Sequence, residues 1–190
     1  AKWSFSKLTL TAGLRLEDVE IIKRDYTTKD PRRTGHLRID GDNHATELLP
    51  SFGINYKILK PLSIFAGIHE GFAPPSVAKY YRQKPEKSIN LESGLRLNLG
   101  TLRMEAIGYY NDYSNMLGSD LAAAGGQGTL DQFTVGAATV KGFEFLASWQ
   151  PLPRAWRVQL PLQLSYTYTD TKMKNEFYSA AWGEVFAGDE

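Results

Sequence analysis

The sequence predicts an all-β fold, an antiparallel meander of about seven long strands. Apolar and polar residues alternate over runs of about ten positions, and this period of two places the apolar side chains on one face of each strand. Strands of about 9–11 residues are long enough to cross a bilayer at a tilt, whereas strands of globular proteins average about 5–6. The connections between the runs are alternately long and short, as in a membrane β-barrel.

The clearest element is a hairpin with arms at residues 89–99 and 102–110. The two residues between the arms begin with Gly100, and glycine in the first position is typical of a two-residue hairpin turn. Pairing across this turn places Arg96 opposite Glu105 on the polar face. An opposite-charge pair of this kind favours the register by a few tenths of a kcal/mol to about 1 kcal/mol.

Five further strands follow from the same alternation. In chain order they are residues 7–17, with a continuation to Lys23, and then 48–58, 62–69, 142–149 and 158–169. Phe65 departs from the pattern because it falls on the polar face of its strand. Pro161 lies inside the last strand, where a proline removes a ladder hydrogen bond, so we expect a bulge there.

The connections favour a membrane barrel over a compact domain, which rarely needs several long structureless loops. Membrane barrels have short turns on the periplasmic side and longer loops outside. We therefore expect residues 24–46, 71–88, 112–137 and 170–190 to be extracellular, and the turns near 59–61, 100–101 and 150–156 to be periplasmic. Trp149 and Trp156 flank one of these turns, where amphipathic rings suit a membrane interface.

Composition excludes several other classes of protein. The chain has 22 basic and 21 acidic residues, so its net charge of +1 gives no indication of a nucleic-acid partner. It has no cysteine, which excludes disulfides and thiolate metal sites. The mean hydropathy of -0.35 and the lack of a long apolar run exclude a transmembrane helix, but half of each barrel strand faces a polar lumen and lowers this average. No paired nucleophile and base or phosphate-binding loop is present, so we expect neither an enzyme nor a cofactor.

Several segments resemble the barrel of TonB-dependent outer-membrane receptors in order and spacing. They are Gly13 to Glu17, Gly71-Phe72-Ala73-Pro74-Pro75, Pro85 to Ser88, Asn90 to Arg96, and Val140-Lys141-Gly142-Phe143-Glu144. Within this family the chain looks most similar to the ferric dicitrate receptor branch, partly because of Trp182-Gly183-Glu184 and Gly188-Asp189-Glu190 near the end of the chain.

The resemblance implies import of a ferric chelate, either a siderophore or ferric citrate, across the outer membrane of a Gram-negative bacterium. It also implies a closed barrel of about 22 strands with a plug domain in its lumen and energy from the TonB complex. Within residues 1–190 we expect no signal peptide, no plug domain and no terminal strand with an aromatic end. We therefore expect residues 1–190 to be an interior segment of such a barrel, since about seven strands leave two unpaired edges that lipid cannot satisfy.

Two sets of candidate residues follow. Arginine recognises carboxylate chelates through its planar fork, and tyrosine stacks on ligands. The candidate ligand contacts in the predicted external loops are Arg32, Arg33, Arg38, Tyr80, Tyr81 and Arg82. The polar residues expected to face the lumen or the plug are Arg15, Glu92, Arg96, Glu105 and Glu144. The histidines His36, His44 and His69 lack the spacing of a metal site.

Two alternatives remain open at this point. One is another outer-membrane barrel, either a passive porin or an autotransporter pore. The other is a soluble β-sheet binding module, which would not depend on detergent for its solubility.

Overall fold

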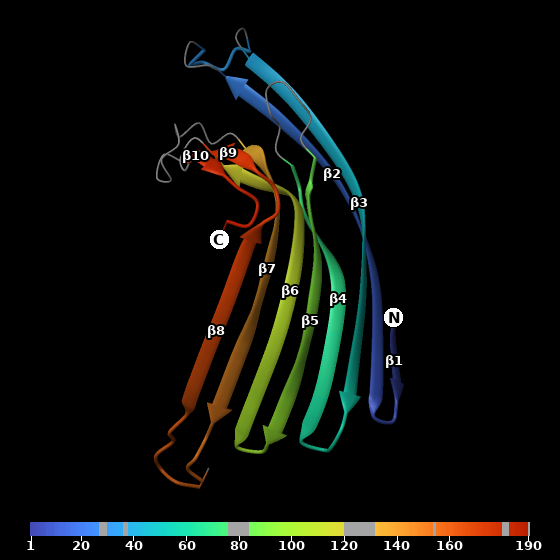
Figure 1. Cartoon of the computed structure of the whole chain (residues 1–190), viewed down its shortest axis with the longest axis vertical. Coiled ribbons are helices and arrows are strands. Elements are labelled where there is room, and N and C mark those ends of the chain that lie inside the picture. The colour runs from blue at the N-terminus through green and yellow to red at the C-terminus, as the bar shows by residue number, and fades with distance from the viewer. Residues whose placement is uncertain are drawn as a thin grey trace.

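One antiparallel sheet dominates the computed structural model, which describes residues 1–26, 30–35, 38–75, 84–119, 132–153, 155–179 and 183–189. Eight strands pair in chain order, and the sheet curves along its length (Figure 1). The strands are β1 Lys2–Phe5, β2 Leu8–Tyr26, β3 Arg38–Lys57, β4 Leu62–Ala73, β5 Glu86–Leu99, β6 Leu102–Ser119, β7 Gln132–Trp149 and β8 Leu162–Met173. A separate hairpin pairs β9, Phe177–Ser179, with β10, Gly183–Val185.

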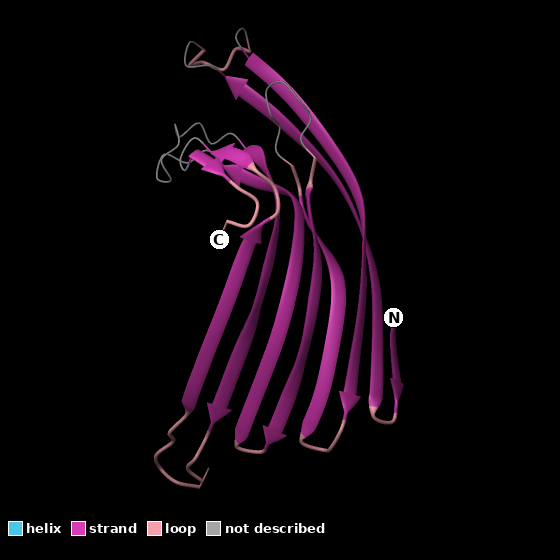
Figure 2. Ribbon diagram, in the orientation of Figure 1, coloured by secondary structure: helices cyan, strands magenta, loops and turns pink. Residues whose placement is uncertain are grey.

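Every regular element of the described residues is a strand (Figure 2). No helix in this part of the chain is long and apolar enough to cross a membrane.

The predicted central hairpin is confirmed as β5 and β6. Arg96 pairs with Glu105, and Gly100 has a φ of 71°, the left-handed conformation that a turn with glycine first requires. The short connections after β1, β3, β5 and β7 all lie at one edge of the sheet, the lower edge in Figure 1, which we call the turn edge. The opposite edge, which carries the other connections, is called the loop edge.

Two of the predicted loops are largely strand. β2 continues to Tyr26 and β3 already begins at Arg38, so most of residues 24–46 belongs to a long hairpin. In the same way β6 runs to Ser119 and β7 starts at Gln132, inside the predicted loop 112–137. The backbone groups of these segments are satisfied by ladder hydrogen bonds, although their side chains no longer follow the alternation.

Three smaller expectations are also corrected. β1 and the hairpin of β9 and β10 were not predicted. β8 starts at Leu162, so Pro161 precedes the strand and causes no bulge. The irregular pairing lies instead between β6 and β7 near Asn115, which has a φ of 53°.

The backbone register determines which side chains share a face of the sheet. One row crosses seven strands on the apolar face, and we call it the central row: Leu10, Ile54, Ala66, Ser93, Gly108, Phe143 and Tyr168. Large side chains on this face are exposed, with Leu14 at 69%, Leu16 at 66% and Leu164 at 59%. A soluble sheet module would bury them, since each buried side chain contributes about 1.5–3 kcal/mol. The apolar face is therefore a lipid-facing surface, which argues against the soluble module.

Candidate functional site

The five residues predicted to face the lumen all lie on the polar face of the sheet. Arg96 donates from Nε and Nη2 to the two carboxylate oxygens of Glu105 at 3.0 and 2.7 Å. Arg15 Nε lies 3.0 Å from Glu17 Oε1 on the same strand. Because the Arg96 side chain is about half exposed, its pair contributes roughly 0.2–1 kcal/mol and mainly holds the two side chains in place.

Phe65, which breaks the alternation of β4, covers a glycine on the next strand. It is paired with Gly94, and a Cβ at Gly94 would lie 2.8 Å from Phe65 Cζ and also meet the Ala106 carbonyl oxygen. The Arg96 guanidinium lies 4.9 Å from the centroid of the same ring. The aromatic ring thus fills the space above a glycine and supports the arginine on the polar face.

Tyr109 and Gly142 repeat this arrangement between β6 and β7. A Cβ at Gly142 would lie 2.6 Å from Tyr109 Cζ and would also meet the carbonyl oxygen of Tyr168. The Tyr109 hydroxyl continues across the glycine and forms a hydrogen bond of 2.6 Å with Thr169 Oγ1 on β8. Tyr109 lies in the middle of β6 on the polar face, opposite Glu92.

A recess of about 530 Å³ lies on the polar face among these groups. His69, Glu92, Tyr109 and Glu144 line it and come from β4, β5, β6 and β7. Two carboxylates, an imidazole and a phenol together accept hydrogen bonds from cationic or amide groups. This part of the polar face is therefore suited to hydrogen-bond donors such as ammonium, guanidinium and amide groups.

The predicted ligand contacts are not brought together in the described residues. Arg32 and Arg33 lie in a turn between β2 and β3, and Arg33 is placed 5.9 Å from the ring centroid of Tyr26. The buried Asp30 organises this turn, because its carboxylate accepts hydrogen bonds from Thr34 N, Thr34 Oγ1 and Gly35 N at 2.8–3.0 Å.

The side chains of the other four predicted ligand contacts lie outside the described residues. Arg38 begins β3, and its side chain lies outside the description, as do Tyr80, Tyr81, Arg82 and His36 entirely.

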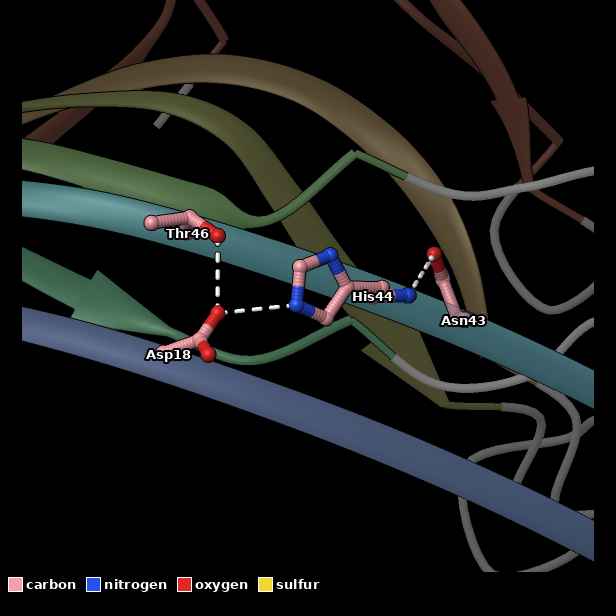
Figure 3. Close-up of polar contacts among 4 residues, drawn as sticks. All are labelled: Asp18, Asn43, His44 and Thr46. Carbon is pink, nitrogen blue, oxygen red and sulfur yellow. Dashed lines mark hydrogen bonds and ion pairs between the residues drawn. The ribbon is translucent and has the colours of Figure 1, made fainter.

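A polar cluster on the apolar face was not predicted (Figure 3). His44 Nε2 and Thr46 Oγ1 each lie 2.8 Å from Asp18 Oδ1, and Asn43 Oδ1 accepts a hydrogen bond of 3.0 Å from His44 N. Asp18 follows Leu16 on the same face of β2, so the cluster marks the point where that face becomes polar. The hydroxyl of Thr46 and the ring of His44 hold the pKa of Asp18 below its ordinary value.

Metal binding by the chain's own side chains finds no support in the described residues. They contain no group of three or more His, Cys, Asp or Glu side chains arranged to hold a metal ion. His44, which falls inside the predicted loop 24–46, lies on β3, and His69 lies on β4.

Comparison with known proteins identifies the family. Residues 1–188 match the family described as TonB dependent receptor-like, beta-barrel. The alcaligin outer-membrane receptor FauA from Bordetella pertussis has a TM-score of 0.65 and 22% identity over 90% of this chain and 28% of its own. The ferric yersiniabactin uptake receptor FyuA from Yersinia pestis has a TM-score of 0.63 and 16% identity over 88% and 25%.

A third structure agrees. The FrpB iron transporter from Neisseria meningitidis has a TM-score of 0.63 and 16% identity over 90% of this chain and 24% of its own. At these identities the solved structures show the fold, and the chain spans about a quarter of their length. The family match covers nearly the whole chain. The chain therefore belongs to the TonB-dependent receptors, and its strands form part of a β-barrel of the Gram-negative outer membrane.

Proposed function

We propose that the chain is an interior part of the barrel of an outer-membrane receptor that binds and imports a ferric chelate, either a siderophore or ferric citrate. The TonB complex supplies the energy for this import. The observation that carries the proposal is the division of one long-stranded sheet into an exposed apolar face and a charged polar face, in a chain that belongs to this family. The structural neighbours named as siderophore and iron receptors support this cargo class.

The edges of the sheet support the proposal that further strands complete the barrel. β1 pairs with only the first part of β2, from Leu8 to Thr11, and β8 pairs with β7 alone. The outer edges of β2 beyond Thr11 and of β8 therefore lie in the lipid-facing region, where an unpaired backbone group costs several kcal/mol. Neighbouring strands on both sides remove this cost.

The polar face supports the proposal of a plug domain inside the lumen. Glu92 and Glu144 line the recess, and Arg96 lies nearby with Glu105. In the receptor these groups hydrogen-bond the plug or lumenal water. Ligand contact falls to the loop edge, where Arg32 and Arg33 supply forks for a carboxylate chelate.

Uptake of radioactive iron tests the proposal in the bacterium that carries the gene. The gene encoding the chain is deleted, and uptake of ⁵⁵Fe-citrate, ferric alcaligin and ferric yersiniabactin is compared with that of the parent strain. We expect uptake of one chelate to fall in the deletion strain and to return when the full-length gene is restored.

A second deletion, of tonB, separates active import from passive diffusion. We expect it to abolish the same uptake even when the receptor is present. Uptake that continues without TonB would instead indicate a passive pore, and uptake of all chelates that is unaffected by the receptor deletion would refute the proposed cargo.

A further inference from the structure

The apolar face carries a groove of about 810 Å³ in its middle. Its floor is formed by Ala66, Ser93 and Gly108, which are successive members of the central row on β4, β5 and β6. The residues directly above them on the same face are much larger, and Leu91 and Tyr110 form the wall toward the loop edge. Three small residues on adjacent strands thus leave a trough across an otherwise bulky surface.

Nothing within the sheet requires a glycine at position 108. Its φ is not in the left-handed region, and a Cβ would meet nothing closer than the Ser93 carbonyl oxygen at 4.0 Å. Gly94 and Gly142 differ, because aromatic rings on the polar face occupy the space above them. Glycine weakens a strand interior, and where no bulge or bend explains it, it is typical of a site that a ligand or another backbone approaches closely. Gly108 faces the apolar side of the sheet, so such an approach would come from the lipid.

The loop-edge end of the groove is polar. Lys141 and Tyr110 line it there, and Tyr168 lines the groove from the central row. Lys141 Nζ lies 3.0 Å from Asp170 Oδ2, and its side chain is 55% exposed. An ammonium group has three N–H donors, so Lys141 retains capacity for a phosphate oxygen, and the tyrosine hydroxyls add further donors.

We propose that this groove is a specific binding site for a phosphorylated lipid of the outer membrane. One acyl chain lies over Ala66, Ser93 and Gly108, and the phosphate contacts Lys141 at the level where the apolar face becomes polar. A lysine at the edge of a lipid-facing apolar surface complements an anionic headgroup. The proposal depends on the membrane position of the barrel and is independent of which chelate the receptor imports.

Native mass spectrometry of the delipidated full-length receptor in detergent tests the site. The probes are phosphatidylglycerol and diacylglycerol with the same two acyl chains. For the wild-type receptor we expect the first phosphatidylglycerol to bind at least tenfold more tightly than diacylglycerol. Gly108→Val fills the floor of the groove and has room for its Cβ, so we expect it to weaken binding of both lipids at least tenfold.

Two further variants isolate the two parts of the site. Lys141→Gln should weaken phosphatidylglycerol binding and leave diacylglycerol binding unchanged. Ala147→Val adds a similar side chain to the apolar face outside the groove and should bind both lipids as the wild type does. Heat-modifiable migration in gel electrophoresis confirms that each variant is folded.

Equal binding by wild type and Gly108→Val, or a wild-type receptor that does not distinguish the two lipids, would overturn the proposal. Unchanged phosphatidylglycerol binding by Lys141→Gln would overturn the assignment of the phosphate to Lys141.

Discussion

Replacing Gly142 by alanine should destabilise the barrel by about 1.5–4.5 kcal/mol. The new methyl group would lie 2.6 Å from Tyr109 Cζ, about 1 Å closer than ordinary carbon contact, and would also meet the Tyr168 carbonyl oxygen. Overpacking of this kind costs about 1–3 kcal/mol. If Tyr109 turns away to make room, its 2.6 Å hydrogen bond to Thr169 is lost, which costs about 0.5–1.5 kcal/mol more.

Gly53→Ala is the matched control. Gly53 also lies on the polar face inside a strand, but its Cβ would meet only the Ala66 carbonyl oxygen at an ordinary 3.8 Å. Alanine in a strand interior is more favourable than glycine by roughly 0.5–1 kcal/mol, so this variant should be neutral or slightly more stable. Guanidinium unfolding of the full-length receptor in detergent, followed by circular dichroism of the β signal, measures both variants.

A second substitution separates the two contacts at Gly142. Tyr109→Ala in the Gly142→Ala background removes the ring but leaves the backbone contact with Tyr168. The double mutant should therefore be more stable than the sum of the two single changes predicts, by about 1–3 kcal/mol. Equal unfolding midpoints for Gly142→Ala and Gly53→Ala would refute the packing argument.

Three further predictions concern the polar groups. Glu105→Gln should cost no more than about 1 kcal/mol because Arg96 is half exposed, and a double-mutant cycle with Arg96→Gln measures this pair. Asp30→Ala removes three hydrogen bonds from the turn at residues 30–35 and should accelerate limited proteolysis there, whereas Arg32→Ala should not. Thr46→Val removes the largest cause of the lowered Asp18 pKa, so carboxyl NMR titration should show that pKa rising. The lowered pKa contributes stability at neutral pH that is lost as the pH falls through it, and the variant should show a weaker dependence because only His44 still lowers the pKa; an unchanged titration would contradict the assigned cause.

The membrane-crossing parts of the fold were predictable because one rule governs them. Between lipid and lumen, apolar and polar side chains must alternate along each strand. The opposite charges of Arg96 and Glu105 also indicate the register of one hairpin. The end of β2 beyond Lys23 and the loop-edge half of β3 were missed because the rule changes outside the bilayer. Asp18 and Glu20 fall on the face that Leu16 occupies, while Val19 falls on the face of Arg15, so the pattern reverses within one continuous strand.

The remaining differences have other causes. β1 has four residues, too few for a periodic signal. The face of each lumenal charge could be read from its strand parity alone. The contacts of Asp18 with His44 and Thr46 could not, because they depend on pairing in a segment that was predicted to be a loop. The groove over Gly108 requires the register of three strands at once.

The tilt of the strands can be estimated from the border on the apolar face, which is the level at which the first charged residue follows the apolar ones. On the apolar face of β2 the first charged residue is Asp18, eight residues from Leu10 of the central row. On the apolar face of β8 it is Asp170, two residues from Tyr168 of that row. Measured from the central row, the border therefore moves toward the turn edge by roughly six residues over the six strand steps from β2 to β8. Asp112 on β6 lies at an intermediate distance from that row. With about 3.3 Å per residue and about 4.8 Å per strand, this slope corresponds to a tilt of about 35°.

Membrane barrels tilt their strands by about 35–45°, so the sequence-encoded border and the barrel geometry agree. Strands perpendicular to the bilayer could not satisfy both ends of the sheet. A membrane level that keeps Leu16 in lipid would also immerse Lys141 and Asp170, and a level that frees those charges would leave Leu14 and Leu16 in water. Tilt resolves this conflict because the border then lies parallel to the membrane surface. The central row, and the groove along it, must accordingly cross the bilayer obliquely.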